Sequence, residues 1–114
     1  MPIVKPKQGD ELPRAYYEPG MKREDWEQQV FDRATLFTVV RKVGPAKLER
    51  KEFISLARAM RAAIIRQGGT WRRDPRAMLY AVDPHGSSFC IPPQEWKVYL
   101  DRWEANKRSA AKNL

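Results

Sequence analysis

The sequence has little of the chemistry that disulfides, metal sites and nucleophilic enzymes require. Cys90 is its single cysteine and His85 its single histidine. One cysteine excludes an intramolecular disulfide and indicates a reducing compartment, so we expect a cytoplasmic protein. Because His85 falls in an expected surface turn with no ligand set around it, the sequence predicts neither a metal site nor a catalytic pair.

Long apolar segments and nucleotide-binding motifs are also missing. The first residues lack the roughly 7–15 apolar positions of a signal peptide, and no stretch reaches the about 18 needed to cross a bilayer. Glycine-rich phosphate loops, zinc-ligand spacings and the hydrolase nucleophile motif are absent as well. We therefore expect no membrane partner, no cofactor and no catalytic residues, which favours a non-enzymatic role.

Positive charge is what the sequence has in excess. Lys and Arg total 22 against 14 acidic residues, a formal net charge of +8 on 114 residues. Such a surplus attracts nucleic acid, anionic lipid or an acidic protein. Hydrophobic residues still make up 42% of the chain, which is enough apolar material for one folded domain.

The distribution of proline and of apolar residues divides the chain into three segments. Residues 1–20 carry four prolines and two glycines and predict an extended arm. Residues 21–106 predict a single α+β domain, and residues 107–114 predict a polar C-terminal tail. The domain should hold an N-terminal helix over 22–34, followed by strands over 36–43 and 47–54 and a helix over 55–67. Strands over 78–82 and 87–91 and a last helix opened by a proline pair complete it.

The order strand, turn, strand, helix thus occurs twice. The spacing from Phe53 to Met60 to Ile64 equals that from Phe89 to Trp96 to Leu100. Such matched spacings can arise whenever a strand is followed directly by a helix, so they do not decide whether the two units come from an internal duplication. In either case the pattern predicts an antiparallel sheet of about four strands in two ββα units, with the helices on one face. The opposite face would be a binding platform if the N-terminal helix leaves it bare.

The densest functional signal lies between residues 58 and 76. Asp74 is the only acid there, and six arginines against it give this stretch a formal charge of +5. Guanidinium groups bind phosphates through two parallel hydrogen bonds and stack on bases. Trp71 lies inside this run and predicts a base-stacking residue, although a tryptophan after a helix can instead close the core. The predicted nucleic-acid-binding residues are Arg58, Arg61, Arg66, Trp71, Arg72, Arg73 and Arg76.

A second basic group falls on the first predicted hairpin. It consists of Arg41, Lys42, Lys47, Arg50 and Lys51. Glu49 and Glu52 offset much of its charge, so ordinary cross-strand pairing explains it almost as well as phosphate binding does.

Two functions fit these patterns. The first is a small basic non-catalytic protein that binds RNA or DNA, with single strands favoured because a flexible basic segment carries an aromatic residue. The second is an inhibitor or accessory subunit that binds an acidic protein or a larger complex, because Trp and Arg are enriched at interface hot spots.

Overall fold

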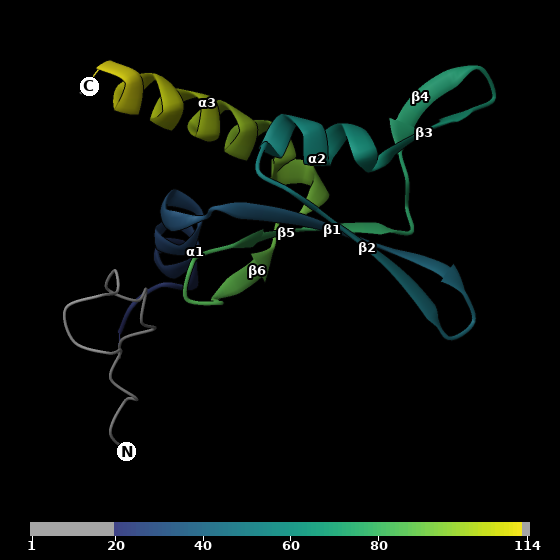
Figure 1. Cartoon of the computed structure of the whole chain (residues 1–114), viewed down its shortest axis with the longest axis horizontal. Helices are drawn as coiled ribbons and strands as arrows, with labels where there is room; N and C mark the ends of the chain where they lie inside the picture. The colour runs from purple at the N-terminus through teal and green to yellow at the C-terminus, as the bar shows by residue number, and fades with distance from the viewer. Residues whose placement is uncertain (1–19, 113–114) are drawn as a thin grey trace.

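The computed structural model describes residues 20–112, and the expected arm over 1–20 lies outside these residues apart from Gly20. The predicted α+β class is confirmed (Figure 1). The described elements are α1 (Arg23–Arg33), β1 (Leu36–Gly44), β2 (Lys47–Phe53), α2 (Leu56–Ala62), β3 (Ile64–Gln67), β4 (Thr70–Arg73), β5 (Ala77–Val82), β6 (Ser88–Cys90), a 3-10 turn η1 (Pro93–Glu95) and α3 (Trp96–Lys112).

Four strands form one antiparallel sheet in the order β2-β1-β5-β6. The first strands of the two ββα units are therefore neighbours at the centre, and the second strands form the edges. Because side chains alternate along a strand, the register separates two faces. Phe37 opposes Ala81 and Val39 opposes Leu79 on the buried inner face, whereas the residues between them point to the outer face.

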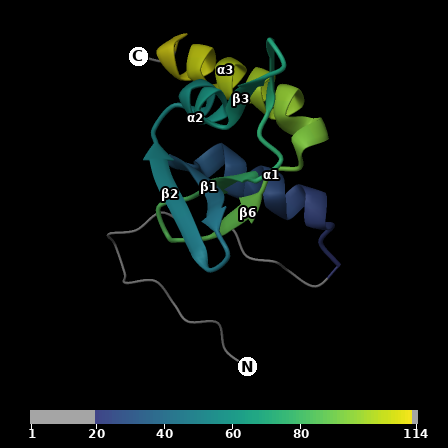
Figure 2. The same cartoon turned by 90° about the vertical axis from the view of Figure 1, so that its right-hand side faces the viewer.

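The helices α2 and α3 cover the inner face of this sheet (Figure 2). Leu56 and Ala59 of α2 and Trp96 and Tyr99 of α3 are buried in the shared core. The indole nitrogen of Trp96 donates to the carbonyl oxygen of Ile91 at 2.9 Å, so burial of this large ring leaves no unsatisfied donor. The predicted placement of two helices on one face is confirmed.

The helix α1 joins α3 through an aromatic contact and an ion pair. Phe31 lies 4.7 Å from Tyr99 and 6.0 Å from Phe37, measured between ring centroids, so α1 packs toward the inner face. At the surface, Nε of Arg102 donates to a carboxylate oxygen of Asp32 at 2.7 Å. Burial by itself would raise the pKa of Asp32. Hydrogen bonds from Arg102 and from the side-chain amide of Asn106 on α3 lower this pKa below its usual value.

The helix expected over 55–67 is wrong in its second half. The helix α2 begins as expected, with the Ser55 hydroxyl accepting from the backbone nitrogen of Arg58 at 3.3 Å, but it ends at Ala62. Residues 64–73 form instead a separate two-stranded hairpin of β3 and β4. Its turn is Gly68 and Gly69, both with positive φ (61° and 82°), the backbone of a tight two-residue turn that glycine adopts without strain.

Two further expectations concern the second ββα unit. The turn after β5 is confirmed, since the backbone nitrogen of Gly86 donates to the carbonyl of Asp83 at 3.0 Å. The segment from residue 107, expected as a polar tail, continues α3 as far as Lys112. A cation–π contact within α3 favours this continuation, because the Lys107 ammonium lies 4.4 Å from the ring centroid of Trp103.

Candidate functional site

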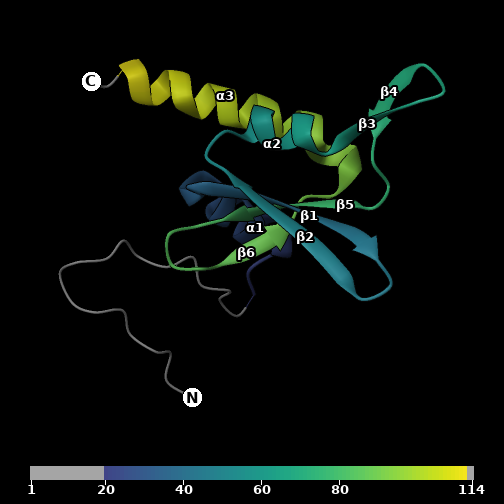
Figure 3. The ribbon, with the colours of Figure 1, turned by 45° about the vertical axis from the view of Figure 1, so that its right-hand side comes forward.

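The β3–β4 hairpin carries three of the six predicted arginines, on two opposite faces. Its register opposes Arg66 with Trp71 and Ile64 with Arg73, so these four residues share one face. The other face carries Arg72, whose guanidinium donates to the Gln67 side chain at 3.4 Å. The hairpin projects from the end of the molecule where the β1–β2 turn also lies (Figures 1 and 3).

Trp71 is exposed on this hairpin rather than closing the core. Its side chain is 63% exposed, and the Arg66 guanidinium carbon lies 6.0 Å from its ring centroid. Arg73 occupies the same face two residues away, with one guanidinium nitrogen 3.3 Å from the carbonyl of Asp74. The Trp71 ring is therefore a large apolar surface open to solvent, with one cation over it and a second on the same face of the hairpin.

The remaining two arginines of the helical stretch lie on α2, directly before the hairpin. Arg58 and Arg61 are exposed, and with Ala62 they line a shallow surface depression. Neither guanidinium forms an ion pair with any described residue. The α2 arginines and the hairpin arginines therefore lie on consecutive elements and not on a single helix.

Asp74 connects the bases of the two hairpins. It is fully buried, and its carboxylate accepts from Nε of Arg41 at 2.6 Å and from Nε of Arg76 at 3.2 Å. Hydrogen bonds from Arg76, aided by Arg41, hold the pKa of Asp74 well below its usual value despite burial. The only acid between residues 58 and 76 is thus committed to this internal cluster and does not neutralise the hairpin arginines.

The second basic group is divided by the fold. Arg41 points inward, where it binds Asp74, Glu49 at 3.3 Å and the carbonyl of Ala62 at 2.7 Å. Its side chain is only 15% exposed, so it supports the structure and is not placed to meet a phosphate. The four other members, which form no ion pair with a described residue, are Lys42, Lys47, Arg50 and Lys51.

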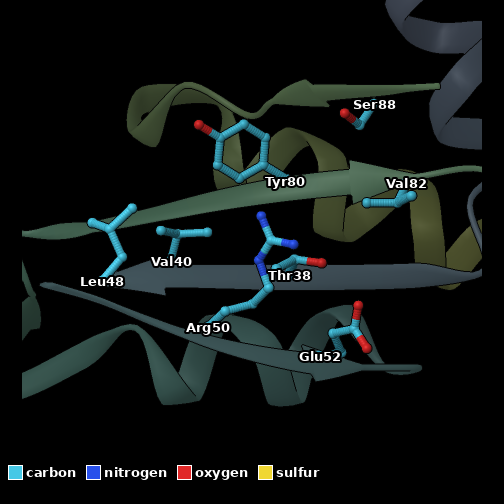
Figure 4. Close-up of a pocket in the computed structure, with 8 residues that line it drawn as sticks. All are labelled: Thr38, Val40, Leu48, Arg50, Glu52, Tyr80, Val82 and Ser88. Carbon is cyan, nitrogen blue, oxygen red and sulfur yellow. The ribbon is translucent and has the colours of Figure 1, made fainter. Parts of the chain in front are cut away.

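The outer face of the sheet, expected as a binding platform if the N-terminal helix left it bare, carries a hollow whose lining residues were not identified from the sequence. The hollow has a volume of about 430 Å³ and spans all four strands, with α2 and α3 behind the sheet (Figure 4). Tyr80 lies over β5, and the Arg50 side chain extends from β2 in its direction (Figure 4). The alternation of Thr38, Val40 and Lys42 with the core residues of β1 marked this face in the sequence, but only strand order shows which side chains meet there.

His85 and Cys90 are the residues of the sequence that come nearest to catalytic or metal-binding groups. Among residues 20–112, no group of three His, Cys, Asp or Glu side chains is placed to hold a metal ion. Burial raises the pKa of Cys90, which disfavours a reactive thiolate. His85 lies in the turn between β5 and β6, as expected. No helix of the described part of the chain is long and apolar enough to cross a membrane.

Comparison with known proteins adds no further assignment. No family model matches the chain, and no curated protein or solved structure shows significant similarity to it.

Proposed function

We propose that this is a non-catalytic nucleic-acid-binding protein whose principal contact surface is the β3–β4 hairpin together with the exposed face of α2. The observation that carries the proposal is the position of Trp71, 63% exposed on a projecting hairpin with Arg66 and Arg73 on the same face. This surface consists of Arg58, Arg61, Arg66, Trp71, Arg72 and Arg73, and we call it the arginine surface.

Electrostatics supports phosphate as the group that this surface binds. Within residues 58–76 the single acid is buried and held by Arg41 and Arg76, so the exposed arginines keep their full charge. Arg72 meets only an uncharged amide oxygen at 3.4 Å, and Arg73 meets only a backbone carbonyl. These guanidinium groups can therefore exchange weak contacts for bidentate bonds to phosphate at little cost.

The exposed indole favours single strands over duplexes. Bases in a duplex are already stacked on one another, whereas an unpaired base can stack on Trp71 and gain about 1–3 kcal/mol irrespective of its identity. The ligand that fits best is therefore single-stranded RNA or DNA with weak sequence preference.

Fluorescence anisotropy with labelled single-stranded RNA, single-stranded DNA and duplex DNA over a range of salt concentrations tests this proposal. The test variant is Arg72→Ala with Arg73→Ala. Loss of two phosphate contacts should flatten the plot of log affinity against log salt by about 1.4 for single strands, at about 0.7 per contact. The matched control is Lys107→Ala with Arg108→Ala, which removes the same charge at the far end of α3 (Figure 1).

The expected result is tight, salt-sensitive binding that the hairpin variant weakens similarly for all sequences and the control leaves nearly unchanged. If both variants lower the affinity equally, net charge rather than the arginine surface is responsible. If the wild-type protein binds no polymer at low salt, the proposal fails, and an acidic protein partner becomes the hypothesis to test by pull-down.

A further inference from the structure

We propose that the outer-face hollow is a second binding site, which holds one unpaired nucleobase stacked on Tyr80. The inference rests on the proposed function, because it assigns a further contact to the same class of ligand. It differs from the arginine surface in location and in chemistry, since it lies on the opposite side of the sheet from α2 and contributes a base contact rather than a phosphate contact.

The register of the sheet places Tyr80 at the middle of a row of side chains. Thr38 opposes both Glu52 and Tyr80, and Tyr80 opposes Cys90, so this row crosses all four strands. Figure 4 shows the Tyr80 ring nearly face-on, lying over the sheet with its flat side outward. Val40 adds an apolar side chain to a lining that also contains polar groups. A flat aromatic face is a surface against which a planar base stacks.

The charges around the hollow fit a base better than a free phosphate. Arg50 and Glu52 both line it, and they bring one positive and one negative charge. A phosphate would be attracted by one and repelled by the other, whereas a base edge presents both acceptors and amino donors to such a pair. The hydroxyl groups of Thr38 and Ser88 add further hydrogen-bonding capacity to the walls.

Arg50 supplies the charge complementarity for the nucleotide that carries this base. It opposes Val40 in the register, and its guanidinium forms no ion pair with a described residue. Both residues line the hollow, and in Figure 4 the Arg50 side chain extends from β2 in the direction of Tyr80. An unpaired cation next to a stacking platform can bind the phosphate of the stacked nucleotide or lie against its base.

The basic residues beyond the hollow indicate the path of the phosphate backbone. The next row toward the β1–β2 turn contains Lys42, which opposes Leu48, and Lys47 follows at the turn itself. Glu52 lies on the other side of Arg50, so positive charge increases toward this turn. The β3–β4 hairpin projects from the same end of the molecule (Figure 3). A single strand can thus leave the hollow past the first hairpin and reach the arginine surface.

Photo-crosslinking tests this site directly. Single-stranded oligonucleotides that carry 5-iodouracil are bound to the full-length protein, irradiated, and the tryptic peptides are identified by mass spectrometry. Tyr80 falls in the peptide 77–97 and Trp71 in the peptide 67–72, so the two sites give separate products. The expected result is crosslinking at both residues. Crosslinking confined to the 67–72 peptide would overturn this inference and leave the proposed function standing, whereas absence of wild-type binding would overturn both.

Substitution of Tyr80 gives an independent measurement. Loss of a base-stacking contact worth about 1–3 kcal/mol predicts that Tyr80→Ala binds single strands about 5- to 150-fold more weakly. Its salt dependence should stay unchanged, because no charge is removed. Tyr80→Phe keeps the ring and is the control, with affinity expected near that of the wild type. Equal affinity of the two variants for single strands, with both folded by circular dichroism, would refute the base site.

Discussion

Replacing Asp74 by Asn tests whether the buried ion-pair cluster, which links β1 to the segment between β4 and β5, stabilises the fold. The change keeps the shape of the side chain and removes its charge. In the wild-type protein the carboxylate accepts from Arg41 at 2.6 Å and from both the backbone and the side chain of Arg76. In Asp74→Asn, Arg41 remains largely buried, with Glu49 as its charged partner and the Ala62 carbonyl and the uncharged Asn oxygen as its other acceptors.

The size of the effect follows from the burial of the two partners. Removing one member of a buried ion pair destabilises proteins by about 3–5 kcal/mol, because the other charge stays uncompensated. Arg76 is 58% exposed and can turn to water, and Arg41 retains Glu49, so we expect the lower end of that range. A loss of about 3 kcal/mol lowers Tm by about 12–20 °C in a domain of this size.

The pH dependence of the same variant has a defined sign. The folded-state pKa of Asp74 lies well below the ordinary carboxyl value of 3.8, chiefly because of hydrogen bonds from Arg76. A lowered pKa contributes stability that is fully present above the unfolded value and is lost as pH falls through the folded value. The difference in unfolding free energy between wild type and Asp74→Asn should therefore be constant near neutrality and shrink below about pH 4.

Urea unfolding followed by circular dichroism, from pH 7 to pH 2.5, measures both quantities. The matched control is Asp101→Asn, which breaks an exposed ion pair with Lys97 and should cost less than about 1 kcal/mol. The reasoning is refuted if Asp74→Asn unfolds within about 0.5 kcal/mol of the wild type at pH 7, which is the usual range for surface substitutions. A difference that stays constant down to pH 2.5 would contradict the pKa argument alone.

Two further predictions concern the hairpin turn and the thiol. Gly69→Ala places a side chain at a backbone φ of 82°, where no atom lies within 4 Å of the added Cβ. The expected loss of stability, about 1–2 kcal/mol, therefore comes from backbone strain in the hairpin and not from a steric clash. Amide hydrogen exchange should accelerate over residues 64–73 while the global Tm stays nearly unchanged, and a drop in global Tm would show that the hairpin supports the core. Cys90, whose pKa burial raises, should react with a disulfide reagent at pH 7.5 more slowly than in the urea-unfolded chain; equal rates would show that it is fully accessible.

The antiparallel sheet was predictable because its hairpins are encoded by patterns between residues close together in the sequence. Alternating apolar residues over 36–43 and 78–82, each followed by a turn and a second strand, are sufficient to indicate two hairpins. The β3–β4 hairpin was predictable in principle, since Gly68 and Gly69 separate an isoleucine pair from a threonine and a tryptophan. The apolar residues just before the glycine pair also fit the spacing of a helix that continues from α2. A short apolar run is compatible with both the helical period of 3.6 and the strand period of 2, so the spacing did not separate the two structures.

The roles of individual arginines could not be predicted. Arg41 and Arg50 are both strand residues in a basic stretch, yet one is buried against Asp74 and the other lines an open hollow. The alternation of side chains along a strand assigns Arg41 and Arg50 to opposite faces of the sheet. It does not identify which face the helices cover or which acidic residue lies near each arginine. Those facts depend on residues more than thirty positions away, as the Arg41 to Asp74 bond illustrates.

The sequence by itself determined the charge surplus, the α+β class, the pairing within each ββα unit and the presence of an arginine-rich stretch with a tryptophan. These properties depend on composition and on contacts between near neighbours along the chain. Tertiary structure alone decided that Trp71 is exposed, that Asp74 is buried in an internal cluster, and that Tyr80 and Arg50 line the same hollow. The exposure of Trp71 depends on which parts of the chain the helices and the sheet cover. The Asp74 cluster and the hollow require strands far apart in sequence to lie side by side, because hydrophobic burial selects the sheet order and a local pattern does not record it.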